Sequence, residues 1–248
     1  MVMLSSIFKR VFLLTWTLYC PVLVASDPYW QNEIDVGMLF YNGNNNAKHV
    51  NGSLLSEYQR QMLENSFRVT GLLAINKNAE TRYKERNAEK YTFTDTIYYI
   101  FSPKHFSYVR GEGVKDHFSP YAYEITESIG YGYHFFKHDN LVWQISGGPG
   151  GRHNKTANGL HQDEFIAHFA NELYYEITSH TSFKQSFSLD AGLINTKSHL
   201  INELKTALFG PVSTKISFEL EHYVNLPDAS EYSKKTDATT KVTLSYTF

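Results

Sequence analysis

Apolar and polar residues alternate one by one through most of the chain after Trp30. Successive side chains of a β-strand point to opposite faces, so this alternation predicts strands with one apolar and one polar face. The last segment is the most regular example, because its polar residues alternate with Val242, Leu244, Tyr246 and Phe248. We find about twelve such segments and no helical periodicity. The sequence therefore predicts an all-β protein.

The connections between the predicted strands alternate in length along the chain. Long connections are expected near residues 42–48, 77–90, 115–120, 152–162, 191–198 and 225–237, and short ones near 61–65, 102–104, 136–140, 177–180 and 209–213. Outer-membrane barrels have long external loops, short periplasmic turns and an even number of strands. The pattern predicts a transmembrane antiparallel up-and-down β-barrel of about twelve strands. A secreted soluble β-protein, such as a β-sandwich, is the structural alternative.

Three local features refine these strands. The segment 105–114 is the least regular, and its glycines Gly111 and Gly113 predict a bulge or kink. In the next segment Tyr121 is expected on the same apolar face as Tyr123 and Ile125. The glycine-rich run 147–151 lacks the Lys-Ser/Thr ending of a phosphate loop, so we interpret it as relief of crowding at a tight bend.

The first residues predict export. Lys9 and Arg10 precede an apolar run at 11–25, which is shorter than the roughly 20 residues of a membrane-spanning helix. This is typical of a cleavable secretory signal peptide, which we place at residues 1–26, with the barrel domain at 27–248. The only cysteine, Cys20, falls within the signal, so we expect a mature chain without disulfides or thiolate chemistry.

Composition is compatible with a barrel. Charged residues make up 19% of the chain and aromatic residues 15%. Barrel strands mix lipid-facing and lumen-facing residues, so a polar average does not exclude a membrane protein. The formal net charge of −2 leaves no basic stripe, and nucleic acid is a poor candidate partner.

Several motifs spread over nearly the whole mature chain resemble the DUF481 family. They are Gly43-Asn44-Asn45-Asn46, Gly113 with Asp116-His117-Phe118, Gly130-Tyr131-Gly132-Tyr133, Gly147-Gly148-Pro149-Gly150 and Lys235-Thr236-Asp237. Members are described as salt-induced outer-membrane proteins of Gram-negative bacteria. The resemblance implies an outer-membrane location and a link to salt or osmotic stress, and it carries over no catalytic residue. Asn45 departs from the family pattern, in which Gly-Asn-Thr is common.

If the apolar faces contact lipid, the opposite faces place charges of both signs inside the barrel. About twelve strands enclose more space than the roughly eight whose interior side chains fill, and less than an open porin. Two interpretations stay open: a narrow channel whose charges select solutes, or a closed interior whose charges neutralise one another. The candidate lumen-lining residues are Glu33, Asp35, Glu57, Arg68, Glu124, Arg152, Glu164, His168, Glu172, Lys184, Asp190, Lys205, Lys215, Glu219 and Lys241, with Glu203 and Glu221 on the same faces.

We expect no enzymatic activity, no cofactor and no metal site. The chain has no Gly-x-Ser-x-Gly motif, and its histidines near predicted strand ends and loops lack the spacing of metal ligands. His168 with Ser186 or Ser188 and Glu172 offers parts of a hydrolase site. An outer-membrane hydrolase acting on lipid or a cell-wall fragment is therefore the alternative to a structural or narrow-pore role.

Expected partners follow from the outer-membrane location. Membrane lipid and lipopolysaccharide would surround a monomeric barrel. The terminal aromatic residues Tyr246 and Phe248 resemble the assembly signal of outer-membrane barrels. This resemblance predicts contact between the last strand and the barrel-assembly machinery.

Overall fold

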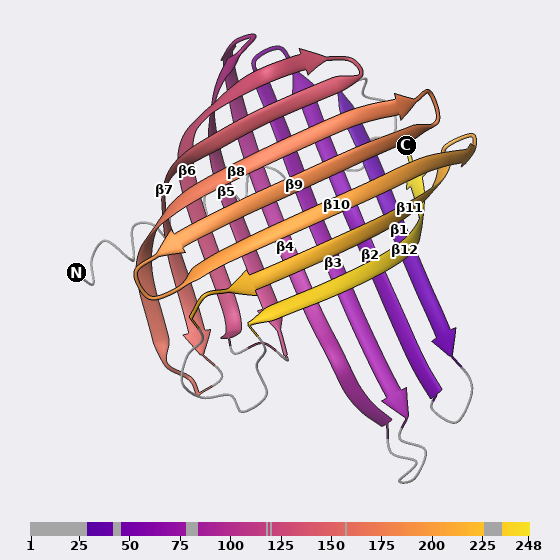
Figure 1. The fold of residues 1–248 in the computed structure, drawn as a ribbon, viewed down its shortest axis with the longest axis vertical. Coiled ribbons are helices and arrows are strands. Elements are labelled where there is room, and N and C mark those ends of the chain that lie inside the picture. Colours follow the sequence, from indigo (N-terminus) through magenta and orange to yellow (C-terminus); the bar gives the residue numbers. More distant parts are fainter. Residues whose placement is uncertain are drawn as a thin grey trace.

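Twelve antiparallel strands form a closed barrel (Figure 1). The computed structural model describes residues 29–41, 46–77, 84–117, 119, 121–156, 158–225 and 235–248, and the predicted signal peptide lies outside them. Each strand pairs with its neighbours in sequence and β1 pairs with β12, so the predicted fold and strand number are confirmed. In the described part of the chain, no helix has the length and apolar character needed to cross a membrane.

The strands are β1 (Trp30–Tyr41), β2 (Asn46–Arg60), β3 (Leu63–Lys77), β4 (Lys84–Ser102), β5 (His105–Asp116), β6 (Tyr121–His138), β7 (Leu141–Thr156), β8 (His161–Thr178), β9 (Thr181–Gly192), β10 (Thr196–Phe209), β11 (Val212–Tyr223) and β12 (Thr236–Thr247).

The two ends of the barrel differ in their connections. At one end, here called the turn end, every connection is two residues long, whereas at the other, the loop end, connections have between three and twelve residues. The alternation is as predicted, but the predicted loops are too long. β4 begins at Lys84, inside the expected loop 77–90, and β7 continues to Thr156, inside the expected loop 152–162. Crossing a bilayer takes about 9–11 residues of a strand, so these longer strands continue past the level where an apolar face is needed.

Two local predictions are wrong. Gly111 and Gly113 lie in unbroken register with both neighbouring strands, so β5 has no bulge there. The irregularity is in β6, whose register against β7 shifts between Tyr121 and Tyr123. An extra residue reverses the face of the strand on one side of it. Tyr121 is consequently turned inward and only 3% exposed.

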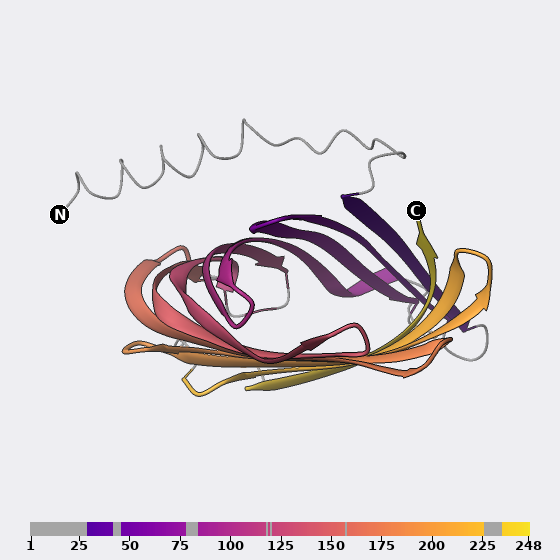
Figure 2. The ribbon, with the colours of Figure 1, turned by 90° about the horizontal axis from the view of Figure 1, so that it is seen from above.

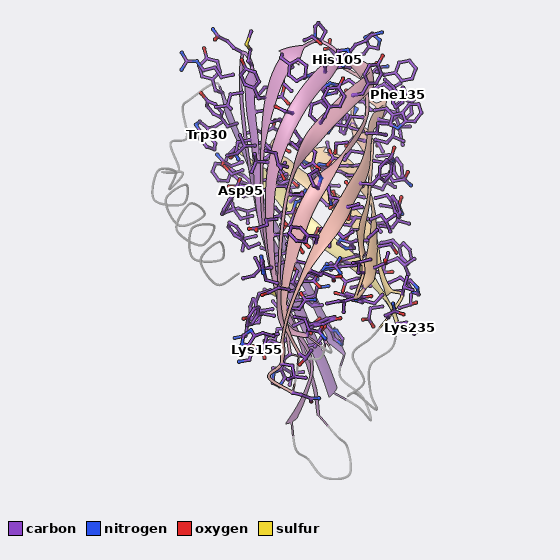
Figure 3. All side chains as sticks on the ribbon, turned by 90° about the vertical axis from the view of Figure 1, so that its left-hand side faces the viewer. Trp30, Asp95, His105, Phe135, Lys155 and Lys235 are labelled. Carbon is purple, nitrogen blue, oxygen red and sulfur yellow. The ribbon has the colours of Figure 1, made fainter. Side chains whose placement is uncertain are left out.

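The outer face of the barrel is apolar and carries aromatic rings near the turn end. Figure 3 marks this end by Trp30, His105 and Phe135, and the loop end by Lys155 and Lys235. Aromatic girdles of this kind lie at the membrane interfaces of outer-membrane barrels. The exposed aromatic residues at the turn end include Tyr29, Tyr99, Phe101, Phe135, Phe136, Tyr175, Phe209, Tyr246 and Phe248.

The barrel is flattened in cross-section (Figure 2). Strands β8 to β12 form one broad wall, and the strands of the opposite wall, β1 to β5, cross them at a steep angle (Figure 1). The seam between the walls is short, since four residue pairs in register join β1 to β12, from Glu33–Thr247 to Val36–Leu244, and Asn32 and Phe248 exchange two backbone hydrogen bonds beside them. Every other neighbouring pair of strands is in register over at least ten residues.

One carboxylate lies on the outward face halfway along β4. Asp95 lies on the same face of the strand as the exposed Tyr91, Ile97 and Tyr99, and Figure 3 shows it away from both ends of the barrel. The amide nitrogen of Asn65 on β3 donates to Asp95 at 2.7 Å and to the Thr96 carbonyl at 3.2 Å. These two polar side chains therefore satisfy each other within an apolar surface.

We expect the double substitution Asn65→Leu with Asp95→Leu to stabilise the barrel by about 1–2 kcal/mol, because a polar pair facing lipid is replaced by apolar side chains. The measurement is the free energy of unfolding by urea in phosphatidylcholine vesicles. Ile97→Leu, on the same face, is the control and should change little. A double variant less stable than the parent would contradict the expectation.

Candidate functional site

Charged side chains from opposite walls meet across the lumen. Arg68 on β3 lies 3.5 Å from Glu203 on β10. Lys90 on β4 lies 3.0 Å from Glu221 on β11. In each pair the two strands are five positions apart in a ring of twelve, so they lie nearly opposite each other. The flattening visible in Figure 2 brings these side chains within contact distance.

A second cluster, the seam cluster, consists of Glu33, Asp35, Lys205 and Lys215. Glu33 on β1 pairs with Lys205 from β10 and with Lys215 from β11. Lys215 also lies 2.8 Å from Asp35, which accepts a 2.5 Å hydrogen bond from Ser245 on β12. The cluster therefore ties β1 to three strands on the far side of the seam.

Arg152 organises the loop end of the lumen. Its side chain is fully buried, and its guanidinium donates to Glu164 at 3.0 Å. It also donates to the backbone carbonyls of Asn195 at 3.0 Å and Asp190 at 2.9 Å. Arg152 thus joins β7 to β8, β9 and the connection that follows β9.

Lys197 continues this network toward β6. Its ammonium lies 2.7 Å from Glu124, which is also 3.9 Å from the Nε of Arg152. The ammonium sits 5.5 Å from the centre of the Tyr223 ring, and that ring contacts Tyr121. Lys197 and Glu124 are each only 3% exposed, so this side of the loop end is filled.

Two cavities occupy the lumen and meet at one level. The larger, about 440 Å³, reaches toward the turn end and is bordered by Glu33, Glu57 and Lys205. The smaller, about 230 Å³, reaches toward the loop end and is bordered by Lys90 and Glu219. The residues that line both cavities include Arg68, Tyr98, Glu172, Lys184, Glu203 and Lys215. The Arg68–Glu203 ion pair therefore crosses the lumen where the cavities meet.

Aromatic side chains fill the lumen along β4 to β6. Phe106 is fully buried and packs 4.7 Å from the His134 ring. A Cβ atom at Gly132 would lie 2.0 Å from the Phe106 ring, so the glycine makes room for it. A Cβ atom at Gly148 would lie 2.1 Å from the Ile129 carbonyl oxygen, which agrees with the crowding expected for the glycine-rich run.

The parts of the suggested hydrolase site do not form a triad. His168 takes Asp190 as its carboxylate partner at 2.5 Å, and Glu172 instead accepts a hydrogen bond from Gln144 at 2.8 Å. Ser186 and Ser188 line the same cavity as His168. Within the described residues, no hydrogen bond joins either serine hydroxyl to the imidazole.

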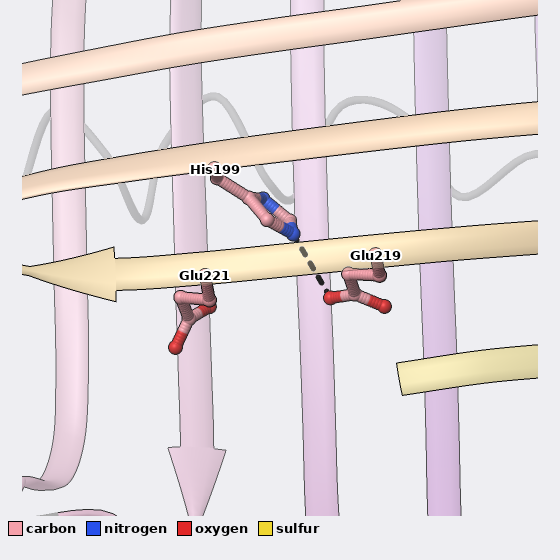
Figure 4. A group of neighbouring side chains, drawn as sticks. All are labelled: His199, Glu219 and Glu221. Carbon is pink, nitrogen blue, oxygen red and sulfur yellow. Dashed lines mark hydrogen bonds and ion pairs between the residues drawn. The ribbon is translucent and has the colours of Figure 1, made fainter. Parts of the chain in front are cut away.

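His199, Glu219 and Glu221 have ligand atoms within 4.8 Å of one another (Figure 4). His199 and Glu219 are hydrogen-bonded at 2.9 Å. Glu219 also pairs with Lys241 at 2.6 Å, and Glu221 pairs with Lys90. These lysines neutralise the carboxylates, so ion pairing accounts for the cluster without a metal ion.

The structure places all fifteen candidate lumen residues on the inward side of their strands, and most of them form ion pairs. Glu57 and Lys184 face the larger cavity without an ion pair in the described part of the chain. The residues joined by ion pairs or charged hydrogen bonds are Glu33, Asp35, Arg68, Glu124, Arg152, Glu164, His168, Asp190, Lys205, Lys215, Glu219 and Lys241. Tyr246 and Phe248 point outward at the turn end, with ring centres 5.8 Å apart.

Six charges that line the lumen were not identified from the sequence, among them Glu64 and Lys137, which fall in segments expected to be turns. Lys90 and Lys197 fall in segments expected to be loops, and Arg110 with Glu112 falls in the segment judged irregular. Extending the inward row of threonines on β4 back by one step would have reached Lys90. The signal was therefore present in the alternation of the strand.

We expect Arg152→Met to lower the free energy of unfolding by about 3–5 kcal/mol, because it leaves buried carboxylates without a counter-charge. Urea titration of the refolded protein in detergent micelles, followed by tryptophan fluorescence, measures the change. Lys184→Met removes an inward charge that has no ion pair and should cost about 0.5 kcal/mol. Equal losses in the two variants would contradict the role given to Arg152.

Comparison with known proteins agrees with the fold. The DUF481 family, described as a protein of unknown function, matches residues 34–248. No curated protein sequence matches the chain. The NanC porin structure has a TM-score of 0.52 at 8% identity, covering 87% of this chain and 98% of that one. At this identity the likeness concerns the fold alone.

Two further structures are less similar. The translocator domain of the autotransporter NalP from Neisseria meningitidis has a TM-score of 0.48 at 7% identity and covers 98% of this chain and 97% of its own. An outer membrane channel from Pseudomonas putida F1 has a TM-score of 0.48 at 9% identity and covers 93% and 100%. These scores support no further conclusion.

Proposed function

The chain belongs to the DUF481 family of proteins of unknown function, and we propose that it forms a narrow passage for small hydrophilic solutes across the outer membrane. In this proposal, ion pairs that cross the lumen close the passage. The observation that carries it is the Arg68–Glu203 contact at the level where the two cavities meet. Enzymatic activity is not part of the proposal.

The cavities favour a passage over a merely filled interior. Cavities of about 440 and 230 Å³ are far larger than the space that one water needs. Glu57 and Lys184 border the larger one half-buried and without an ion pair in the described residues, and charges without partners are costly unless water solvates them. We infer that this cavity is filled with water.

The charges around the larger cavity predict weak selectivity between cations and anions. Five acidic and five basic side chains line it, so neither sign dominates. They are Glu33, Glu57, Glu64, Glu172 and Glu203, and Arg68, Lys137, Lys184, Lys205 and Lys215.

Salt should weaken the closure. The side chains of Arg68 and Glu203 are 25% and 14% exposed, and those of Lys90 and Glu221 are 21% and 10% exposed. Ion pairs in contact with water are screened by dissolved ions more strongly than dry ones. This screening is also the physical route by which the proposed link to salt or osmotic stress would act.

We expect the double substitution Arg68→Ala with Glu203→Ala to raise the single-channel conductance in planar bilayers several-fold. It removes both side chains of the crossing and leaves no unpaired charge behind. In the parent protein, conductance should rise more steeply than bulk conductivity between about 0.1 and 1 M KCl, because screening weakens the crossing.

Glu57→Ala with Lys184→Ala is the matched control. It changes the charge in the same way and in the same cavity, but it breaks no contact across the lumen. We expect its conductance to stay near that of the parent. Flat traces for the parent and both variants at every voltage would refute the passage, and equal conductance of the two variants would refute the Arg68–Glu203 crossing as its closure.

A further inference from the structure

We propose that the barrel opens sideways between β1 and β12, and that a membrane lipid inserts its polar head group through this opening while its acyl chains stay in the bilayer. The inference rests on the membrane location in the proposed function. It does not depend on passage of solutes along the axis.

The opening begins where the seam ends. Beyond Val36 and Leu244, β1 continues to Tyr41 and β12 reaches back to Thr236, with no register between them. Both strands stay paired on their other sides, β1 with β2 as far as Tyr41 and β12 with β11 as far as Thr236. Figure 1 shows β1 and β12 separating toward the loop end, and Figure 2 shows them in different walls. The gap is therefore bounded by two ordered strands.

Gly37 lies at the apex of the opening. A Cβ atom there would lie 2.5 Å from the side-chain oxygen of Asn51 and 2.8 Å from the Val242 carbonyl oxygen. The two strands thus approach closely at Gly37 before they separate. The side-chain amide of Asn51 occupies the space that a side chain at this position would fill.

The outer and inner margins of the opening differ in polarity. On the outside, Val36, Met38, Val242 and Leu244 are 46%, 60%, 62% and 58% exposed, as expected beside hydrocarbon. On the inside, polar residues of β1, β2 and β12 line the smaller cavity, namely Asp35, Asn51, Lys241 and Thr243. The opening therefore connects an apolar exterior to a polar cavity across the thickness of one strand.

A lipid is the occupant that fits these margins. Unpaired backbone N–H and C=O groups facing hydrocarbon cost several kcal/mol each, so the free strand edges need polar partners. The phosphate and ester oxygens of a head group accept hydrogen bonds from these N–H groups. The ammonium of Lys241, whose side chain is 23% exposed beside the cavity and pairs with Glu219 at 2.6 Å, has further N–H groups to donate to the phosphate. The acyl chains meanwhile contact the apolar outer margin.

Disulfide formation tests the opening itself. Cys20 is the only cysteine and lies in the predicted signal, so introduced cysteines would be alone in the mature protein. A disulfide needs Cα atoms within about 7 Å. When membranes containing the protein are treated with an oxidant, we expect the Val36→Cys with Leu244→Cys variant to form a disulfide, because the two residues face each other in the seam. Phe40→Cys with Thr240→Cys, four residues further along each strand, should stay reduced.

Two outcomes of the disulfide test overturn the proposal. Oxidation of the Phe40→Cys with Thr240→Cys pair as complete as that of the seam pair would show a closed seam. A disulfide-linked dimer of the single Met38→Cys variant would show that a second copy of the chain covers the edge. Thiol counting by mass spectrometry and non-reducing gels read these outcomes.

A lipid that carries a maleimide on its head group tests the occupant. In phosphatidylcholine vesicles containing this lipid, we expect Thr243→Cys, which lies beside the opening and leaves Lys241 in place, to form the lipid adduct several-fold faster than Ser146→Cys. Ser146 lines the same cavity from β7, and a water-soluble maleimide normalises the reactivity of the two thiols. Equal normalised rates overturn the proposal. Flat bilayer traces would refute only the axial passage, whereas failure to float with vesicles would refute the membrane location and both proposals.

Discussion

Two lysines hold the barrel closed at the place where its backbone pairing is shortest. Lys205 on β10 and Lys215 on β11 both pair with Glu33 on β1, across the intervening β12. The four residue pairs of the seam provide little backbone bonding compared with the other strand pairs. Ion pairs in a poorly hydrated interior are stronger than on a surface. The charges of the lumen are therefore part of what closes the sheet.

The same cluster links closure of the sheet to closure of the lumen. Lys215 belongs to the seam cluster and also lines both cavities, at the level of Arg68 and Glu203. Arg68 on β3 and Glu203 on β10 form an ion pair at this level because the barrel is flattened and the two strands face each other closely. A change in the separation of the walls would act on the seam and on the crossing together. In the proposed passage, the lumen charges thus have a structural role and close the lumen as well.

The sequence predicted the barrel well where its strands contact lipid. Alternation of apolar and polar residues there follows directly from having lipid on one side and lumen on the other, so strand number and inward residues could be predicted. The predicted strand ends were wrong near Lys84 and Thr156, where the strands continue beyond the apolar belt and both of their faces are polar. The bulge at Tyr121 was missed because one inserted residue leaves little trace in a run of tyrosines.

Contacts across the lumen could not be predicted in the same way. The choice of Glu203 as the partner of Arg68 depends on the flattening of the barrel, and the short seam depends on the different inclinations of the two walls. Both properties belong to the whole sheet and to no single strand. Alternation indicates the face to which a side chain points, but it carries no information about the distance to the opposite wall.

The lumen contains two kinds of filling, and the contrast indicates where function lies. Between β5 and β6 near the turn end an aromatic side chain fills the interior, with Phe106 packed against Gly132. Aromatic side chains can therefore fill the interior of this fold. Elsewhere the interior holds paired charges and two cavities, although apolar side chains of similar volume are often as stabilising as buried ion pairs. Charges are thus retained beside the seam, where Lys241 lines the smaller cavity. The proposed passage and lateral opening depend on this arrangement, because a solute or a lipid head group inside the barrel needs polar contacts.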